Sequence, residues 1–152
     1  MPNGLVQSPK IDPRYTCFQL TIRESRIHRF GVYALEQIPA RRKVIEYTGE
    51  RISRVETKRR GQGRHTYLFT LDAYWTIDGS VGGSGAEIIN HSCNANLQSV
   101  ISKGHIIYFS NRVIEPGEEL TVDYRFSEKI ERVVCRCGAH NCRGAINMTG
   151  VR

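Results

Sequence analysis

Short runs of β-branched and aromatic residues, each separated from the next by turn residues, fill most of this sequence between residues 15 and 124. Such runs are typical of β-strands. They fall at residues 15–22, 30–35, 43–49, 66–71, 74–78, 97–101, 105–111 and 120–124. Because strands this brief do not build a large parallel sheet, the sequence predicts a mainly β domain with little helix.

Local signals predict only a few other elements. Ser53 followed by Glu56 fits a capping box that opens a short basic helix. Residues 85–92 fit one or two helical turns. Residues 115–118 (EPGE) have Pro at the second position and Gly at the third, which predicts a type II turn.

The chain has 152 residues, the size of a single domain. Residues 1–14 contain three prolines and no apolar period, so we expect a flexible N-terminal arm, with the main domain at 15–126 and a connector with a compact tail at 127–152. No apolar run approaches the roughly 18–20 residues that span a bilayer, and the N-terminus lacks the features of a secretory signal. We therefore expect an intracellular protein without a membrane partner.

The tail carries the strongest local signal. Cys135, Cys137 and Cys142 place three thiols within eight residues, and disulfides are not the first expectation in a reducing compartment. A closed structural zinc site needs four ligands. At the level of spacing the fourth ligand is either His140 or a distant residue, for which Cys93 is the candidate. Free thiols clustered by chance are the plain alternative.

A glycine-rich segment at residues 78–85 has partial likeness to nucleotide-binding and hydrolase motifs. No Gly-Lys-Ser/Thr follows it, so a phosphate-binding loop is disfavoured. Residues 82–86 (GGSGA) approach the G-x-S-x-G pattern of serine hydrolases but lack the strand–turn–helix setting that this motif needs. Neither reading explains the segment.

Positive charge is concentrated at residues 51–65. The chain has 22 Lys and Arg against 15 Asp and Glu, a formal charge of 22 − 15 = +7, and this segment holds six of the cations with one acidic residue. Such a segment is usually a solvated face. If it binds a partner, we expect nucleic acid or a nucleoprotein.

Five segments before the tail form an ordered set. They are residues 25–34 (SRIHRFGVYA), 46–50 (EYTGE), 67–69 (YLF), 89–93 (INHSC) and 118–124 (EELTVDY). In this order, and with the cysteine-rich tail as a post-SET segment, they resemble the SET-domain protein lysine methyltransferases. The resemblance covers about residues 17–147.

The resemblance implies a fold and an activity. The fold is a SET domain of several short β-sheets with a knot-like C-terminal crossing (a β-clip), short helices and a zinc-bound post-SET tail. The activity is transfer of a methyl group from S-adenosylmethionine to a lysine amine on an extended segment of a histone or another basic, nucleic-acid-associated protein. The implied location is the nucleus, at chromatin, or a prokaryotic cytoplasm.

The sequence allows two other functions. One is an inactive SET-like module, stabilised by zinc, that binds nucleic acid or a protein partner. Retention of Tyr124, Asn90 and His91 argues against it. The other is a structural zinc protein of unrelated fold.

Several residue roles follow from the resemblance alone. Tyr124 is the expected catalytic residue, which orients the transferring methyl group. The implied zinc ligands are Cys93, Cys135, Cys137 and Cys142, which leaves Cys17 as an expected buried thiol in a strand. The expected cofactor-binding residues are His28, Phe30, Gly31, Tyr67, Asn90, His91 and Arg136, and His91 is expected to form the pocket rather than act as a general base.

Trp75, Val122 and Tyr124 are expected to line the channel for the substrate lysine. An aromatic wall suits an alkylammonium through cation–π attraction. Val122 stands where relatives usually carry Phe or Tyr, and a Tyr there tends to limit the product to monomethyl-lysine. The smaller Val122 predicts room for di- or trimethyl-lysine.

Three positions depart from the family pattern. Arg29 stands where the first Gly of a G-x-G motif is usual, Glu87 where an Arg is frequent, and Ala95 where a Pro is common. Of these, Arg29 affects the geometry next to the cofactor, because Gly allows backbone conformations that are costly for Arg.

Overall fold

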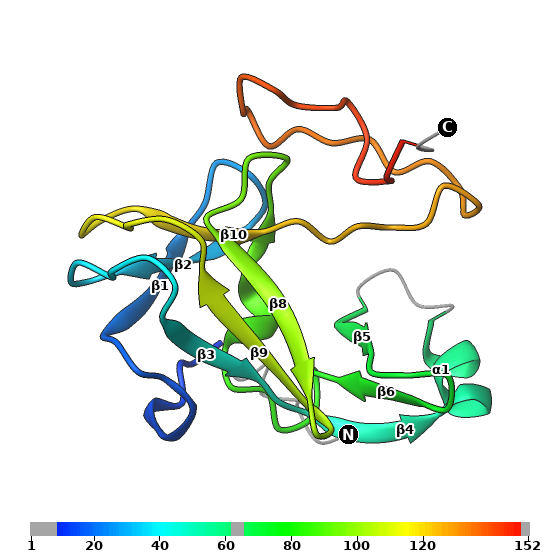
Figure 1. Cartoon of the computed structure of the whole chain (residues 1–152). Helices are drawn as coiled ribbons and strands as arrows, with labels where there is room; N and C mark the ends of the chain where they lie inside the picture. Colours follow the sequence, from blue (N-terminus) through cyan, green and yellow to red (C-terminus); the bar gives the residue numbers. More distant parts are fainter. Residues whose placement is uncertain (1–8, 62–65, 150–152) are drawn as a thin grey trace, which may run out of the picture.

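The computed structural model describes residues 9–61 and 66–149, and the structural statements below concern these residues (Figure 1). Its elements are the 3-10 turn η1 (Pro13–Tyr15), β1 (Leu20–Glu24), β2 (Phe30–Ala34), β3 (Lys43–Tyr47), β4 (Glu50–Ser53), α1 (Arg54–Arg60), β5 (Leu68–Thr70), β6 (Trp75–Asp78), the 3-10 turn η2 (Ala86–Ile88), β7 (Asn90–His91), β8 (Leu97–Ser102), β9 (His105–Ser110) and β10 (Glu119–Val122). The prediction of a mainly β domain is confirmed.

The strands form two sheets. The larger has seven strands in the order β1-β2-β10-β8-β9-β3, with β7 pairing to β10, and the smaller has the order β4-β6-β5. Most pairs are antiparallel, but β10 runs parallel to both β7 and β8. The last strand, β10, thus pairs with β2 from the beginning of the domain and with β7 and β8 from its middle.

Buried residues from both sheets form one hydrophobic core. Its fully buried members share a branched apolar side chain and are Val32, Ile38, Val44, Ile45, Ile114 and Leu120. An aromatic cluster of Tyr47, Phe69 and Tyr108 connects β3, β5 and β9, with ring centroids 5.2–6.3 Å apart. Burial of these rings holds the small sheet against the large one.

The local predictions for helix and turn are confirmed. Ser53 caps α1, its hydroxyl accepting from the Glu56 amide at 3.3 Å. The Glu118 amide donates to the Glu115 carbonyl at 3.1 Å, and Gly117 has a φ of 87°, as a type II turn requires. Of residues 85–92, where one or two helical turns are expected, 86–88 form a single 3-10 turn, but residues 90–91 form β7 instead.

Residues 9–14 of the expected N-terminal arm lie against the domain. The Asp12 amide donates to the Ser84 carbonyl at 2.8 Å, and Ile11 packs against the core. Residues 1–8 fall outside the described residues. None of the described helices is long and apolar enough to cross a membrane.

The connector and tail after β10 fold back over the end of that strand, as the orange and red segments of Figure 1 show. Asn147, 7% exposed, fixes the connector through its side chain. Its amide nitrogen donates to the Ser127 carbonyl at 2.9 Å, and its oxygen accepts from the Val133 amide at 2.8 Å. Polar contacts therefore order a segment that has few apolar ones.

Candidate active site and cysteine cluster

Tyr124, the expected catalytic residue, lies two residues after the end of β10. Parallel pairing sets Val122 opposite His91, so the chain that leaves β10 brings Tyr124 beside β7. The Tyr124 amide donates to Nδ1 of His91 at 3.0 Å, and its hydroxyl donates to the Ile89 carbonyl at 2.6 Å. The structure thus brings together two motifs that lie more than 30 residues apart in the sequence.

His91 is held in one tautomer by its neighbours. A backbone N–H only donates, so Nδ1 of His91 must carry a lone pair and the ring proton sits on Nε2. Nε2 lies 3.4 Å from Sγ of Cys93. Burial lowers the pKa of His91, although the Asp123 carboxylate opposes the shift. With both ring nitrogens engaged, His91 has no free nitrogen to offer to a bound molecule.

Asn90 fastens the loop between β1 and β2. Its side-chain amide donates to the carbonyls of His28 and Phe30 at 3.2 and 2.8 Å, and to Oε1 of Glu119 at 2.9 Å. Gly31 permits this packing, because a Cβ there would lie 2.2 Å from the same Glu119 oxygen. The side-chain amide of Asn90 therefore fixes the segment that carries His28, Phe30 and Gly31, three other expected cofactor-binding residues.

The exposed side of this loop carries His28 and Phe30. Phe30 is 46% exposed, and His28 is exposed as well. Arg136 is also exposed and lies between two cysteines of the tail. These three side chains are exposed, so they are free to contact a bound molecule.

The four expected metal ligands converge. The Sγ atoms of Cys93, Cys135, Cys137 and Cys142 all lie within 4.8 Å of one another. Sγ of Cys93 is 3.7 Å from that of Cys135 and 4.0 Å from that of Cys142. In a tetrahedral zinc site with Zn–S bonds of 2.3 Å, neighbouring sulfurs lie about 3.8 Å apart. The donor set and its spacing fit Zn²⁺.

The surroundings of the cluster decide between the two candidates for the fourth ligand. Cys93 is one of the four clustered ligand groups, and His140 is not among them. Gly138 and Gly144 have φ values of 75° and 78°, so the turns around the thiols use a conformation that favours glycine. Burial raises the pKa of the Cys137 thiol, but hydrogen bonds from the Cys93 and Ala139 amides outweigh it and lower that pKa to about 6.

The expectation for Cys17 was wrong. Its side chain is exposed, and it lies in a bend between η1 and β1 rather than in a strand. The Cys17 amide donates to the Val44 carbonyl at 3.0 Å. Its backbone is therefore tied to the edge of β3 while the thiol points away from the core, an orientation that the apolar pattern of the run did not reveal.

Tyr47 and Phe69 form an apolar wall that the sequence analysis did not single out as a site. The Tyr47 hydroxyl donates to the carbonyl of Tyr67 at 2.5 Å. Burial raises the pKa of Tyr47 and of Tyr108, and the nearby Tyr124 phenol adds to both shifts. Burial likewise raises the pKa of Tyr124, with Tyr67 as the next cause. Tyr47 lies in the motif at residues 46–50 and Phe69 in the motif at residues 67–69. This membership, rather than any local pattern, was the signal that could have identified the two residues as part of a site.

Val122 and Trp75 lie in different surroundings. Val122 is 3% exposed and lines a cavity of about 230 Å³ that also contacts Leu97, Asp123 and Arg125. Trp75 begins β6 in the small sheet, is 38% exposed, and has the Arg51 guanidinium 5.4 Å from its ring centroid. The structure thus gives Trp75 a cation–π partner within the chain.

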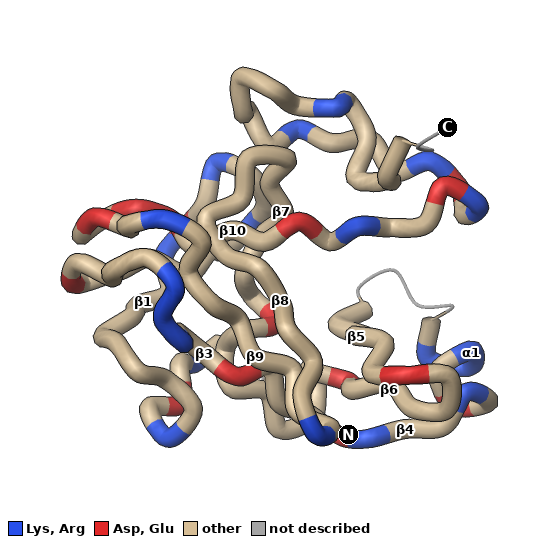
Figure 2. The backbone as a smooth tube through the Cα atoms, in the orientation of Figure 1, with Lys and Arg blue, Asp and Glu red and all other residues tan. Residues whose placement is uncertain are grey.

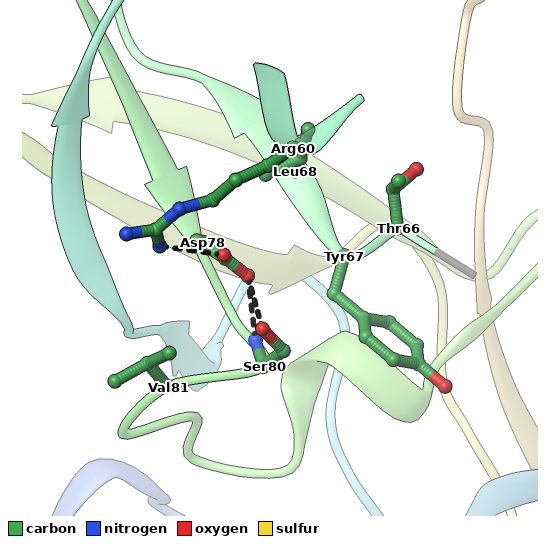
Figure 3. Close-up of a pocket in the computed structure, with 7 residues that line it drawn as sticks. All are labelled: Arg60, Thr66, Tyr67, Leu68, Asp78, Ser80 and Val81. Atoms are coloured by element: carbon green, nitrogen blue, oxygen red, sulfur yellow. Dashed lines mark hydrogen bonds and ion pairs between the residues drawn. The ribbon is translucent and has the colours of Figure 1, made fainter. Parts of the chain in front are cut away.

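A second cavity, of about 320 Å³, lies beside Tyr67. Figure 3 shows the Arg60 guanidinium directed at Asp78, whose carboxylate also binds Ser80, while the Tyr67 ring turns away from this ion pair. Hydrogen bonds to Ser80 and Arg60 lower the pKa of Asp78 in spite of burial, which raises it. At this cavity the negative charge of Asp78 is therefore balanced by the positive charge of Arg60.

Comparisons with known proteins agree with this geometry. The family described as SET domain matches residues 29–125. The histone-lysine N-methyltransferase TRX1 of Oryza sativa subsp. japonica is 42% identical over 140 residues, which is 85% of this chain and 14% of the relative. An H3 lysine-4 specific histone-lysine N-methyltransferase of Candida albicans is 38% identical over 141 residues, covering 84% of this chain and 14% of the relative.

A solved structure is similar as well. The crystal structure of KRYPTONITE in complex with mCHG DNA and SAH superimposes with a TM-score of 0.73 at 30% identity, covering 86% of this chain and 29% of the other. This likeness supports the fold assignment directly. The chain spans only about a seventh of the length of the two curated relatives, since each is covered to 14%.

Proposed function

This chain belongs to the SET-domain family, and we propose that it is a protein-lysine N-methyltransferase that uses S-adenosylmethionine. The single observation that carries the proposal is the position of Tyr124, whose amide is fixed by His91 in β7 and whose hydroxyl is fixed by Ile89 just before that strand. A tyrosine merely filling space at a strand end would not need both anchors.

The loop fixed by Asn90 fits the proposed cofactor. Phe30 offers an exposed ring, His28 and Arg136 offer polar side chains, and Asn90 holds the loop backbone in place. S-adenosylmethionine supplies a methyl group on a positively charged sulfur. The residues of this chain bind and orient it.

The protein must also deliver an uncharged amine. Free lysine has a pKa near 10.4, so deprotonation at pH 7 costs about 4.6 kcal/mol. The rings of Tyr47 and Tyr108 are buried and that of Phe69 is partly buried, and desolvation beside such an apolar cluster lowers the pKa of an ammonium. His91 has no free nitrogen to serve as a base, so we assign catalysis to orientation and desolvation.

We assign Zn²⁺ to the four cysteines of the cluster. Bound there, the ion would link Cys93, which follows β7, to three cysteines of the tail. Such a cross-link fixes a segment that has little core of its own. Its proposed role is structural, namely to hold the tail as one wall of the active site.

The proposed substrate is a lysine on an extended segment of a histone, and the proposed location is therefore chromatin. Support comes from the histone-lysine methyltransferases that the chain resembles over more than four fifths of its length. Trp75 and Val122 remain proposed channel residues, with di- or trimethyl-lysine as the proposed product.

The alternative of a module that binds nucleic acid through residues 51–65 is less favoured. Figure 2 shows Lys and Arg on α1 with acidic residues close by. Arg54 donates to the Ala73 carbonyl at 2.8 Å, Arg59 pairs with Glu56, and Arg60 binds three carboxylates. Arg54 and Arg60 hold α1 against the small sheet, whereas the Arg59–Glu56 pair lies within the helix. Residues 62–65 of the segment lie outside the described residues.

The test is methyl transfer from labelled S-adenosylmethionine by the full chain. Core histones, a histone H3 peptide containing lysine 4, and the same peptide with that lysine changed to arginine are compared by mass spectrometry. We expect label on lysine and its loss in a Tyr124→Phe variant that still binds the cofactor by calorimetry. Absence of label on histones and on proteins of a whole-cell lysate, from zinc-loaded wild-type protein, would overturn the proposal.

A further inference from the structure

The last segment of the tail contacts the chain on both sides of Tyr124. On one side, the Arg143 guanidinium donates to the Asp123 carboxylate at 2.8 and 3.1 Å. On the other, the Met148 amide donates to the Phe126 carbonyl at 2.8 Å. The Phe126 ring in turn packs on the Tyr124 ring, with centroids 5.6 Å apart. The tail therefore contacts Asp123, which precedes Tyr124, and Phe126, which lies two residues after it.

The Asp123 carboxylate stabilises an unfavourable backbone turn. It accepts a hydrogen bond from the Arg125 amide at 3.0 Å, and Arg125 has a φ of 51°. Residues other than glycine rarely adopt this left-handed conformation, because the Cβ crowds the backbone. The turn directly after Tyr124 thus depends on the orientation of the Asp123 carboxylate.

Arg143 determines that orientation. Its side chain is 19% exposed and that of Asp123 is 22% exposed, so the pair is largely removed from solvent. The Arg143 guanidinium also donates to the Ile146 carbonyl at 2.9 Å, while its buried Nε has no partner among the described residues. A bidentate pair in this setting fixes both side chains geometrically.

Arg143 also contacts the cysteine cluster. Its amide donates to Sγ of Cys93 at 3.4 Å, and it follows Cys142 in the sequence. Four thiolates around a divalent cation carry a net charge of about −2. The positive charge of Arg143 compensates part of that charge, while its guanidinium faces Asp123.

We propose that Arg143 is a positioning residue, which acts through Asp123 to hold the turn at Arg125 and thereby the orientation of Tyr124. In this arrangement the metal-bound tail sets the geometry of the reacting site, in addition to enclosing it. The inference rests on the proposed methyltransferase function.

The experiment compares Arg143→Gln, Arg143→Lys and Asp123→Asn in the zinc-loaded full chain. Arg112→Gln is the matched control, because Arg112 makes an exposed pair with Glu118 at 2.9 Å, away from the tail. The measurements are kcat, the KM for S-adenosylmethionine, zinc content, and amide hydrogen exchange of the peptide spanning residues 122–127.

We expect Arg143→Gln and Asp123→Asn to lower kcat by about 10- to 100-fold, the effect of a small misplacement of a reacting group. Zinc content and KM should stay within about 3-fold of wild type, and exchange of the 122–127 peptide should rise. Arg143→Lys should recover part of kcat, since it keeps the charge without the bidentate geometry. Arg112→Gln should behave as wild type.

Unchanged kcat and unchanged exchange in Arg143→Gln would overturn the inference. So would loss of zinc in both the Gln and Lys variants in parallel with activity, since Arg143 would then only hold the tail. Hydrogen exchange needs no turnover, so a wild-type protein without methyltransferase activity would contradict the proposed function while the coupling of Arg143 to the turn was still measured.

Discussion

The Ser25 amide donates to the Arg29 carbonyl at 3.0 Å, and this bond closes a loop in which Arg29 adopts a φ of 40°. Arg29 stands where a glycine is usual in relatives, and the loop takes a left-handed conformation despite the substitution. Asn90 supplies the compensation, because it binds the carbonyls on both sides of Arg29. The loop is thus held by tertiary contacts against its local preference.

Replacing Arg29 with glycine should therefore stabilise the protein. Removing the backbone strain of a non-glycine residue in the left-handed conformation stabilises the folded state by about 1–2 kcal/mol. The larger entropy of glycine in the unfolded chain offsets about 0.4–1 kcal/mol of this gain. We expect Arg29→Gly to raise the free energy of unfolding by about 0.5–1 kcal/mol in urea titrations. Cofactor affinity should change by less than about 3-fold.

Arg26→Gly is the matched control, since Arg26 lies in the same loop without a positive φ. It should lose stability by roughly 0.5–1 kcal/mol. If both variants lost stability equally, the strain assigned to Arg29 would be refuted.

Local sequence signals account for much of the fold. Residues 105–110 form β9, as the run HIIYFS predicts, and the turn at Gly117 follows from its two central residues. β4 was not predicted, because Ile52 is its only buried residue and the other three are polar. The first predicted strand, 15–22, begins only at Leu20, since Asp12 caps the 3-10 turn before it.

The site depended on contacts that no local pattern encodes. The parallel pairing of β10 with β7 joins segments about 30 residues apart, and it was accessible only through the ordered motifs. Asp123 and Arg143 each occur beside a residue that was singled out, yet their mutual contact is a tertiary one. Side-chain exposure, as at Cys17, likewise depends on packing rather than on residue type.

The choice of Cys93 over His140 predicts a specific pattern of metal loss. Cys93→Ser removes one of four clustered thiols, and a three-thiol site binds Zn²⁺ more weakly. We expect the purified variant to contain much less than one equivalent of zinc by atomic absorption and to melt at a lower temperature. His140→Ala and Cys17→Ser should each retain a full equivalent. A full equivalent in Cys93→Ser would refute the assignment.

Glu87 predicts a stability effect that depends on pH. Its carboxylate accepts from the Gly85 amide at 2.9 Å, and burial raises its pKa above the usual 4.5. Between the unfolded and folded pKa values the folded chain binds more protons, so stability falls as pH rises through this window and stays lower above it.

We therefore expect Glu87→Gln, which keeps an acceptor for the Gly85 amide, to stabilise the protein at pH 7 by on the order of 1 kcal/mol. Below about pH 4 the variant and wild type should unfold at similar urea concentrations, because the wild-type carboxyl is then protonated in both states. The control is Glu128→Gln in the exposed connector, which should change little. Equal stabilisation at both pH values would argue against burial of the charge as the cause.

Val122 predicts the degree of methylation. Val122 pairs with His91 and Leu97 on the neighbouring strands, is 3% exposed and borders a cavity of about 230 Å³, so a larger residue has adjacent space to occupy. A tyrosine hydroxyl there would hold water where a dialkylated amine must fit, whereas a phenylalanine adds bulk without holding that water. We expect Val122→Tyr to shift products toward monomethyl-lysine by mass spectrometry, and Val122→Phe to keep di- or trimethyl-lysine.

Because overpacking can cost about 1–3 kcal/mol, both variants are compared at equal folded fraction. Identical product distributions in wild type and Val122→Tyr would remove Val122 from the channel.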